Sequence, residues 1–241
     1  MEKTNSKGIY GTTASLLILQ FFLMTVALVV LGAAIDWPAS LDEPAGAVLP
    51  AITERRDAVL VGYGAYMLYS ILFIPLALLL YHVLAGRDAS SPLLTVAAGF
   101  GVASALARAL GIVRWFVLMP FLAETYLDPR ASEATRESVS LVYLALNEYG
   151  GSIGEILGVQ LFGGLFVGSI SVAMMRSALL PAWIGYTGLT VALLLLSGVL
   201  EVVGFDLGVL LTTSVTALQF WMLAVAVVLI LRSRRSSRQA A

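Results

Sequence analysis

The sequence predicts an all-α integral membrane protein, a bundle of six transmembrane helices with both termini in the cytoplasm. The chain is 59% hydrophobic and 12% charged, whereas a soluble domain is nearer half apolar and a quarter charged. A helix needs about 20 apolar residues to cross a hydrocarbon core about 30 Å thick. Six runs of at least that length occur, over residues 9–35, 59–83, 93–122, 139–175, 182–204 and 207–231.

The 241 residues are enough for one bundle with short loops, so residues 1–241 are expected to form a single domain. The first run could also be a secretory signal, since Lys3 and Lys7 precede it and Gly32-Ala33-Ala34 ends it with small residues. The apolar region of a signal peptide spans about 7–15 residues, however. The greater length of this run favours an uncleaved first helix.

Basic residues near the helix ends predict the orientation, because cytoplasmic loops carry an excess of lysine and arginine. An even number of spans places both termini on one side, and that side is the more basic one. It carries Lys3, Lys7, Arg87, Arg176, Arg232, Arg234, Arg235 and Arg238. The opposite side carries Arg55, Arg56, Arg130 and Arg136. We therefore expect cytoplasmic termini and a multi-pass protein of the inner (plasma) membrane.

The connections give further local expectations. Residues 36–57 contain three prolines, so they form a loop with a short interfacial helix before the second span. Asp128-Pro129 combines an acidic N-cap with proline at a first helical position, which predicts that the fourth helix begins near Pro129. Gly150-Gly151 permits a bend in that helix.

Ionisable residues lie at similar depths inside three successive runs. At a rise of 1.5 Å per residue, Arg114, Glu155 and Glu201 lie about 33, 31 and 30 Å from the cytoplasmic ends of their helices. We therefore expect them in one layer toward the outer side, with Arg114 paired to Glu155 or Glu201. A charge in a membrane span is costly, so it usually faces the protein interior and can mark function.

This layer predicts a polar cavity toward the outer leaflet that binds or transports a small or amphipathic ligand. Arginines would suit a phosphate or carboxylate group. The residues expected to line the cavity are Arg108, Arg114, Glu148, Glu155 and Glu201.

Other interpretations remain open. The same charges could simply hold the helices together. An intramembrane enzyme could use Glu148 or Glu155 as an acid/base on a lipid head group. The chain could also be a structural or regulatory subunit of a membrane complex.

Several chemistries are not expected. The chain has no cysteine and one histidine, His82, which removes disulfides and thiol catalysis. Gly150 to Gly154 matches a nucleophile-elbow pattern, but that elbow needs a strand-to-helix turn and a nearby histidine, so no catalytic residue is assigned and an enzyme is the less favoured class. Arginines in the acidic layer would repel a metal ion, and no metal or cofactor is expected. The net charge of −1 gives no reason to expect a nucleic-acid partner.

The fourth run carries glycines four residues apart, at Gly150, Gly154 and Gly158, and again at Gly164 and Gly168. Small residues at this spacing let another helix backbone approach closely. Packing within the chain is the simpler interpretation, and a homo-oligomer through these faces is the alternative. Membrane lipids are the other expected partners.

Four segments carry a family resemblance. They are Gly8-Ile9-Tyr10-Gly11, Ala107-Arg108-Ala109-Leu110, Leu146-Asn147-Glu148 and the stretch from Arg176 through Leu179-Leu180-Pro181-Ala182-Trp183. In their order the chain resembles an uncharacterised bacterial family of multi-pass membrane proteins, the domain of unknown function DUF4386. Ala182 departs from it, since many members have a basic residue before the tryptophan. The resemblance implies a multi-pass architecture and assigns no chemistry and no site residue.

Overall fold

The computed structural model describes residues 2–86, 91–177, 179–205 and 207–238. These ranges are mostly helical and contain no strand. They include six helical segments long and apolar enough to cross a membrane, which confirms the predicted class of a six-span helical membrane protein. The segments are Gly8–Ile35, Arg56–Ala85, Pro92–Leu127, Glu133–Arg176, Ala182–Val203 and Gly208–Arg234. The side on which the termini lie stays a prediction.

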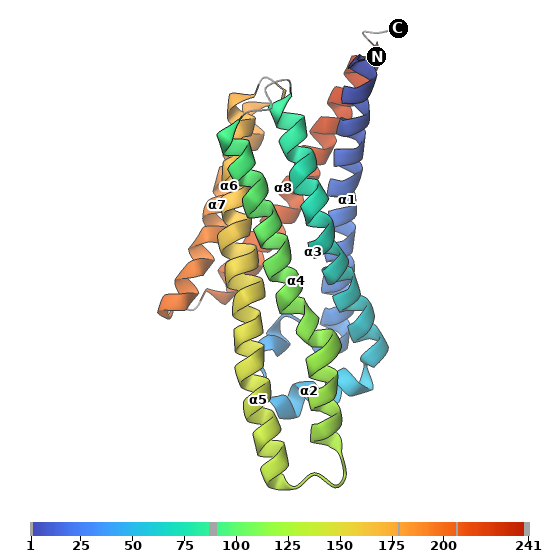
Figure 1. Cartoon of the computed structure of the whole chain (residues 1–241), viewed down its shortest axis with the longest axis vertical. Coiled ribbons are helices and arrows are strands. Elements are labelled where there is room, and N and C mark those ends of the chain that lie inside the picture. The colour runs from blue at the N-terminus through green and yellow to red at the C-terminus, as the bar shows by residue number, and fades with distance from the viewer. Residues whose placement is uncertain (1, 87–90, 178, 206, 239–241) are drawn as a thin grey trace. The chain divides into compact units, whose positions relative to one another are not determined.

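The elements follow one another along the chain as coloured in Figure 1. The α-helices are α1 (Glu2–Ile35), α2 (Ala45–Glu54), α3 (Arg56–Ala85), α4 (Pro92–Leu127), α5 (Glu133–Gly151), α6 (Gly164–Arg176), α7 (Ala182–Ser197) and α8 (Gly208–Arg238). Two 3-10 helices, η1 (Ala39–Asp42) and η3 (Gly198–Val203), and one π-helix, η2 (Ser152–Gly163), complete the order.

The start of α5 differs from the expectation based on Asp128-Pro129. Asp128 instead closes a turn, because its Oδ1 accepts a hydrogen bond from Arg130 N at 2.8 Å. The N-cap is Ser132, whose Oγ accepts from Thr135 N at 3.1 Å. A serine side chain in this position satisfies a backbone donor that the first turn leaves open. The predicted start near Pro129 was therefore wrong.

The fourth span changes helical type within its length. It runs as α5 up to Gly151, as the π-helix η2 from Ser152 to Gly163, and then as α6. The Gly150-Gly151 pair, which permits a bend, stands directly before this change of winding. A π-helix is wider than an α-helix and is found frequently at functional sites. The first turn of this π-helix carries a charged residue, Glu155. This part of the span is therefore a candidate for a functional site.

The chain divides into two compact units. Unit 1 comprises Met1–Phe22, Leu72–Leu106 and Ile156–Ala241, and unit 2 comprises Leu23–Ile71 and Ala107–Glu155. Each unit is described by itself. The single domain expected for residues 1–241 stays a prediction.

Unit 1 is held by close helix approaches at small residues. Trp221 of α8 donates from Nε1 to the carbonyl oxygen of Ile184 in α7 at 3.0 Å. A Cβ on Gly168 of α6 would lie 3.4 Å from Ala192 Cβ in α7. Gly168 of the glycine pattern therefore faces another helix of the same chain, and a homo-oligomer through the glycine faces stays a prediction.

Unit 2 has its own apolar core, which includes residues of the segment 36–57 that was expected to form a loop. The helix expected in that loop is α2, which packs on α5. Its buried residues are Ala45, Val48, Leu49 and Ile52. Their spacing of three and four places them on one face. The core continues through α1, α3, α4 and α5 with Leu31, Val59, Tyr63, Trp115, Met119 and Tyr143.

Candidate ligand-binding site

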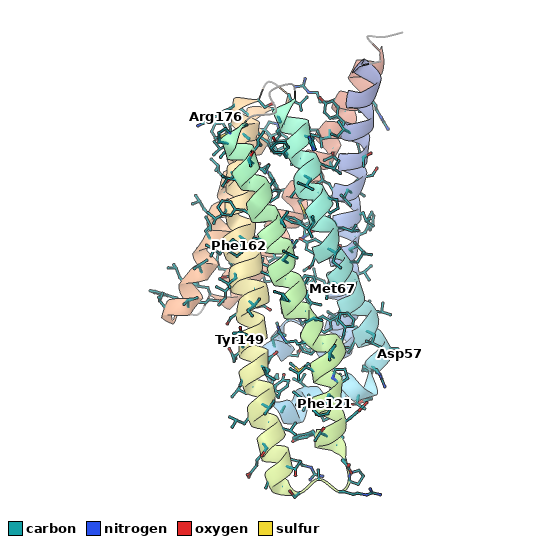
Figure 2. The ribbon with its side chains drawn as sticks, viewed as in Figure 1. Asp57, Met67, Phe121, Tyr149, Phe162 and Arg176 are labelled. Atoms are coloured by element: carbon teal, nitrogen blue, oxygen red, sulfur yellow. The ribbon has the colours of Figure 1, made fainter. Side chains whose placement is uncertain are left out.

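Unit 2 contains a cavity that brings charged and aromatic side chains together. Its volume is about 290 Å³, including the part open to the surroundings. Lining residues come from α3, α4 and α5, which the labels Met67, Phe121 and Tyr149 mark in Figure 2. The lining residues are Trp37, Leu41, Tyr63, Tyr66, Arg108, Gly111, Ile112, Arg114, Trp115, Gly151, Gly154 and Glu155.

Arg114 of α4 lies between α4 and α5. Its Nη1 donates to the carbonyl oxygen of Gly111 at 2.9 Å, and its Nη2 donates to Asn147 Oδ1 at 3.3 Å. A Cβ on Gly150 would lie 2.8 Å from both Cδ and Nη1 of Arg114. The glycine in α5 therefore provides the space that the guanidinium occupies.

Arg108 is deeply buried, with 3% of its surface exposed. Its guanidinium carbon lies 5.0 Å from the ring centre of Tyr69 in α3. A cation over an aromatic face is attracted by the ring electrons. Arg114 has a similar arrangement, 5.5 Å from the ring centre of Trp115. Both cations are thus positioned partly by aromatic rings.

Glu155 brings a carboxylate to the same cavity from the first turn of the π-helix. Two cations and one anion therefore share one cavity in a membrane-spanning part of the chain. Within the described ranges, no three histidine, aspartate or glutamate side chains gather as a metal site would require.

Aromatic rings form much of the remaining lining. Tyr63 stacks on Trp115, with ring centres 4.4 Å apart and planes 14° from parallel. Trp37 meets Tyr66 edge to face at 5.7 Å. This surface suits an apolar or flat group beside the charged one.

Two buried hydrogen-bond donors at the cavity have no acceptor among the described residues. One is the hydroxyl of Tyr63, a residue that is only 2% exposed, and the other is Nε of Arg114. Leaving a buried donor unsatisfied costs about 1–3 kcal/mol, more for a charged group. Both belong to lining residues, so an acceptor bound in the cavity would remove that cost.

The structure brings together three of the five residues that the sequence predicts for the site. Arg108, Arg114 and Glu155 line the cavity. Glu148 of α5 is exposed and does not line it, whereas Glu201 is half-buried on η3 of unit 1. The pairing of Arg114 with Glu155 or Glu201 stays a prediction.

Sequence reasoning missed the aromatic lining and Asn147. Trp115 lies in an apolar run and looks like ordinary core, and Trp37 lies in the expected loop of residues 36–57, so neither gave a signal. The repeat of Tyr63, Tyr66 and Tyr69 at a spacing of three could have given one, because it places three polar-tipped rings along one side of a helix.

The comparisons with known proteins identify a family. The sequence model described as a domain of unknown function (DUF4386) matches residues 16–232. This range contains every residue that lines the cavity, and the match confirms the resemblance noted from the sequence. No curated protein and no solved structure matches the chain.

Proposed function

The chain belongs to the DUF4386 family, whose description assigns no activity, and from that premise we propose that this multi-pass membrane protein binds the anionic group of a small or amphipathic ligand. The binding site is the cavity of unit 2. The observation that carries the proposal is the pair of buried donors, Tyr63 Oη and Arg114 Nε, that find no acceptor in the described part of the chain and belong to a cavity that Arg108 also lines.

The charges of the lining support an anion. Arg108 and Arg114 contribute two positive charges and Glu155 one negative charge. An uncompensated charge in a membrane span is costly, and an anion would compensate the excess cation. Guanidinium groups match the oxygens of phosphate, sulfate and carboxylate with paired N–H donors.

The size of the cavity limits what it encloses. The space that a water-sized molecule can occupy inside the cavity is about 20 Å³, which is close to the room that one water molecule needs. A small anion or the head group of a larger amphipath therefore binds only if the lining side chains move apart. The apolar part of an amphipath would then extend away from the arginines, toward the lipid.

The proposed side of the membrane rests on the distribution of basic residues. The segment η1 and the turn before α5 belong to the side with four basic residues, against eight on the side that includes the termini, and the positive-inside rule assigns the less basic side to the outside. Trp37 and Leu41, which flank or form part of η1, line the cavity. We therefore place the cavity toward the outer leaflet.

Thermal unfolding in a neutral detergent tests the proposal. Sulfate, phosphate and acetate are added singly, and phosphatidylglycerol is compared with phosphatidylcholine to separate a free anion from a lipid head group. We expect at least one anionic additive to raise the Tm of the wild type, and Arg108→Gln and Arg114→Gln to lose that response. Uptake of labelled sulfate into proteoliposomes then separates transport from binding alone.

A matched control removes one arginine outside the cavity. Arg130 is exposed in the turn before α5, so Arg130→Gln changes the net charge equally and should keep the full response. The proposal fails if no anion changes the Tm of the wild type. It fails equally if the Arg108 and Arg114 variants respond as Arg130→Gln does.

A further inference from the structure

We infer that Glu155 is the internal counter-ion of the cavity and that a bound anion takes over this role, so that anion binding is coupled to proton uptake by Glu155. The inference rests on the proposed function, and it adds a regulation of that site by pH. It is carried by the presence of one carboxylate and two guanidinium groups in the lining of one small cavity.

In the empty cavity, the negative charge of Glu155 compensates part of the charge of Arg108 and Arg114. Charges in a partly buried, apolar-walled site are screened far less than in water. The aromatic rings of Tyr63, Trp115 and Tyr66 supply much of that wall. The carboxylate therefore contributes to keeping the arginines charged and ordered while no ligand is bound.

A bound anion places a second negative charge in the same volume. Like charges that share a site disfavour joint ionisation, so the anion either binds weakly or binds together with a proton. The proton comes from water and goes to a carboxylate oxygen of Glu155. The arginines then compensate the ligand instead of the carboxylate, and the neutral Glu155 no longer repels it.

Glu155 is the lining residue that can take up the proton. The ionisable groups that face the cavity are Tyr63 and Tyr66 from α3, Arg108 and Arg114 from α4, and Glu155 from η2, while the η1 region contributes Trp37 and Leu41. Tyrosine and arginine side chains ordinarily titrate near or above about pH 10. Glutamate side chains ordinarily titrate near about pH 4, so Glu155 is the lining group whose charge changes first as the pH falls from neutral.

The direction of the pH dependence follows from linkage. If binding takes up a proton, the affinity for the anion rises as the pH falls, by at most about tenfold per pH unit for one proton. The dependence ends where Glu155 is protonated, or ionised, in both the free and the bound state. Removing the carboxylate charge should give the high affinity at every pH.

Sulfate is the suitable probe, because it stays a dianion throughout the pH range of the measurement and therefore takes up no proton itself. Its dissociation constant is measured by calorimetry for the full-length protein in nanodiscs of phosphatidylcholine. The wild type is compared with Glu155→Gln and with Glu124→Gln, which removes an exposed carboxylate from α4. We expect the wild type and Glu124→Gln to bind more tightly at low pH, and Glu155→Gln to bind tightly without pH dependence.

A second measurement needs no variant. An indicator dye in weak buffer reports the protons taken up when sulfate is added to the wild type, and we expect uptake of up to one proton per sulfate bound. This keeps the inference testable if Glu155→Gln does not fold.

The outcomes separate the inference from the proposed function. If sulfate binds without proton uptake, or if Glu155→Gln keeps the pH dependence of the wild type, the inference is overturned and anion binding stands. If neither sulfate nor an anionic lipid binds the wild type at any pH, the proposed function fails and the inference fails with it.

Discussion

Arg114 and Asn147 are joined across α4 and α5 by a hydrogen bond of 3.3 Å from Nη2 of the arginine to Oδ1 of the asparagine. The other end of the same amide donates from Nδ2 to the carbonyl oxygen of Leu41 at 2.7 Å. Asn147 is 5% exposed, so both hydrogen bonds of its side-chain amide are buried. The amide therefore holds in place both Arg114 of the cavity and the segment that carries Leu41.

Replacing Asn147 with alanine should destabilise unit 2. Asn147→Ala leaves the Leu41 carbonyl oxygen and Arg114 Nη2 without these partners, and an unsatisfied buried polar group costs about 1–3 kcal/mol. We expect a lower Tm, together with faster hydrogen exchange in η1 and the residues beside it. Thermal unfolding and mass-spectrometric exchange measure these two effects.

Ser140→Ala is the matched control for that variant. Ser140 also lies on α5, but its Oγ donates to the carbonyl oxygen of Arg136 in its own helix, at 2.8 Å. Its loss should be nearly neutral, because this bond does not join two helices. Equal melting of the two variants, with unchanged exchange near η1, would show that the Asn147 bridge has no effect on stability.

Gly111 should be far less tolerant of a methyl group than Gly99 in the same helix. A Cβ on Gly111 would lie 2.8 Å from both the carbonyl oxygen of Gly150 and Gly154 Cα. These are backbone atoms that cannot rotate away, so Gly111→Ala must push α4 away from the fourth span. Overpacking of this kind costs about 1–3 kcal/mol, and a lower Tm and a lower yield of folded protein are expected.

Gly99→Ala provides the comparison, because among the described residues no atom outside its own stretch of helix lies within 4 Å of the position that its Cβ would take. Alanine is favoured over glycine in a helix interior by up to about 1 kcal/mol, so this variant should be as stable as the wild type or slightly more stable. If Gly111→Ala melts as Gly99→Ala does, the close backbone approach is not a determinant of stability.

The spans could be predicted from the sequence, because length and apolarity alone decide whether a helix can cross a membrane. Their ends could not be placed so well. Asp128-Pro129 and Ser132 are both plausible helix starts, and the choice depends on which side chain reaches a backbone donor. Here Ser132 caps α5 and Asp128 closes the preceding turn.

The site was predictable in part for a related reason. Charges stand out in apolar runs, so Arg108, Arg114 and Glu155 could be found, and counting residues gave their depth. Depth does not give direction, however. Glu148 and Glu155 are seven residues apart and would share a face of a regular α-helix. The change to a π-helix after Gly151 alters the winding between them, and Glu148 is exposed while Glu155 lines the cavity.

Tyr63→Phe separates a binding role of the Tyr63 hydroxyl from a structural one. The phenylalanine ring can keep the stacking on Trp115, and the change removes a buried hydroxyl that has no partner among the described residues. Without ligand the variant should be as stable as the wild type or more stable, because an unsatisfied group is removed. Its Tm increase on addition of sulfate should be smaller.

Tyr149→Phe serves as the control, since Tyr149 is 67% exposed on α5. It should keep the sulfate response of the wild type. A Tyr63→Phe protein that melts earlier without sulfate and still responds fully to it would assign the hydroxyl to folding rather than to binding.

The absence of cysteine from the sequence makes the predicted topology directly testable. Ser91→Cys places one thiol just before α4, and Ala131→Cys places one in the turn before α5. Because basic residues are retained on the cytoplasmic side, a membrane-impermeant maleimide should label Ala131→Cys in intact cells that express the protein. Ser91→Cys should react only after the membrane is opened. The reverse pattern would invert the topology, and the cavity would then bind its anion from the cytoplasmic side, where phosphorylated metabolites rather than outer-leaflet head groups would be the ligands to examine.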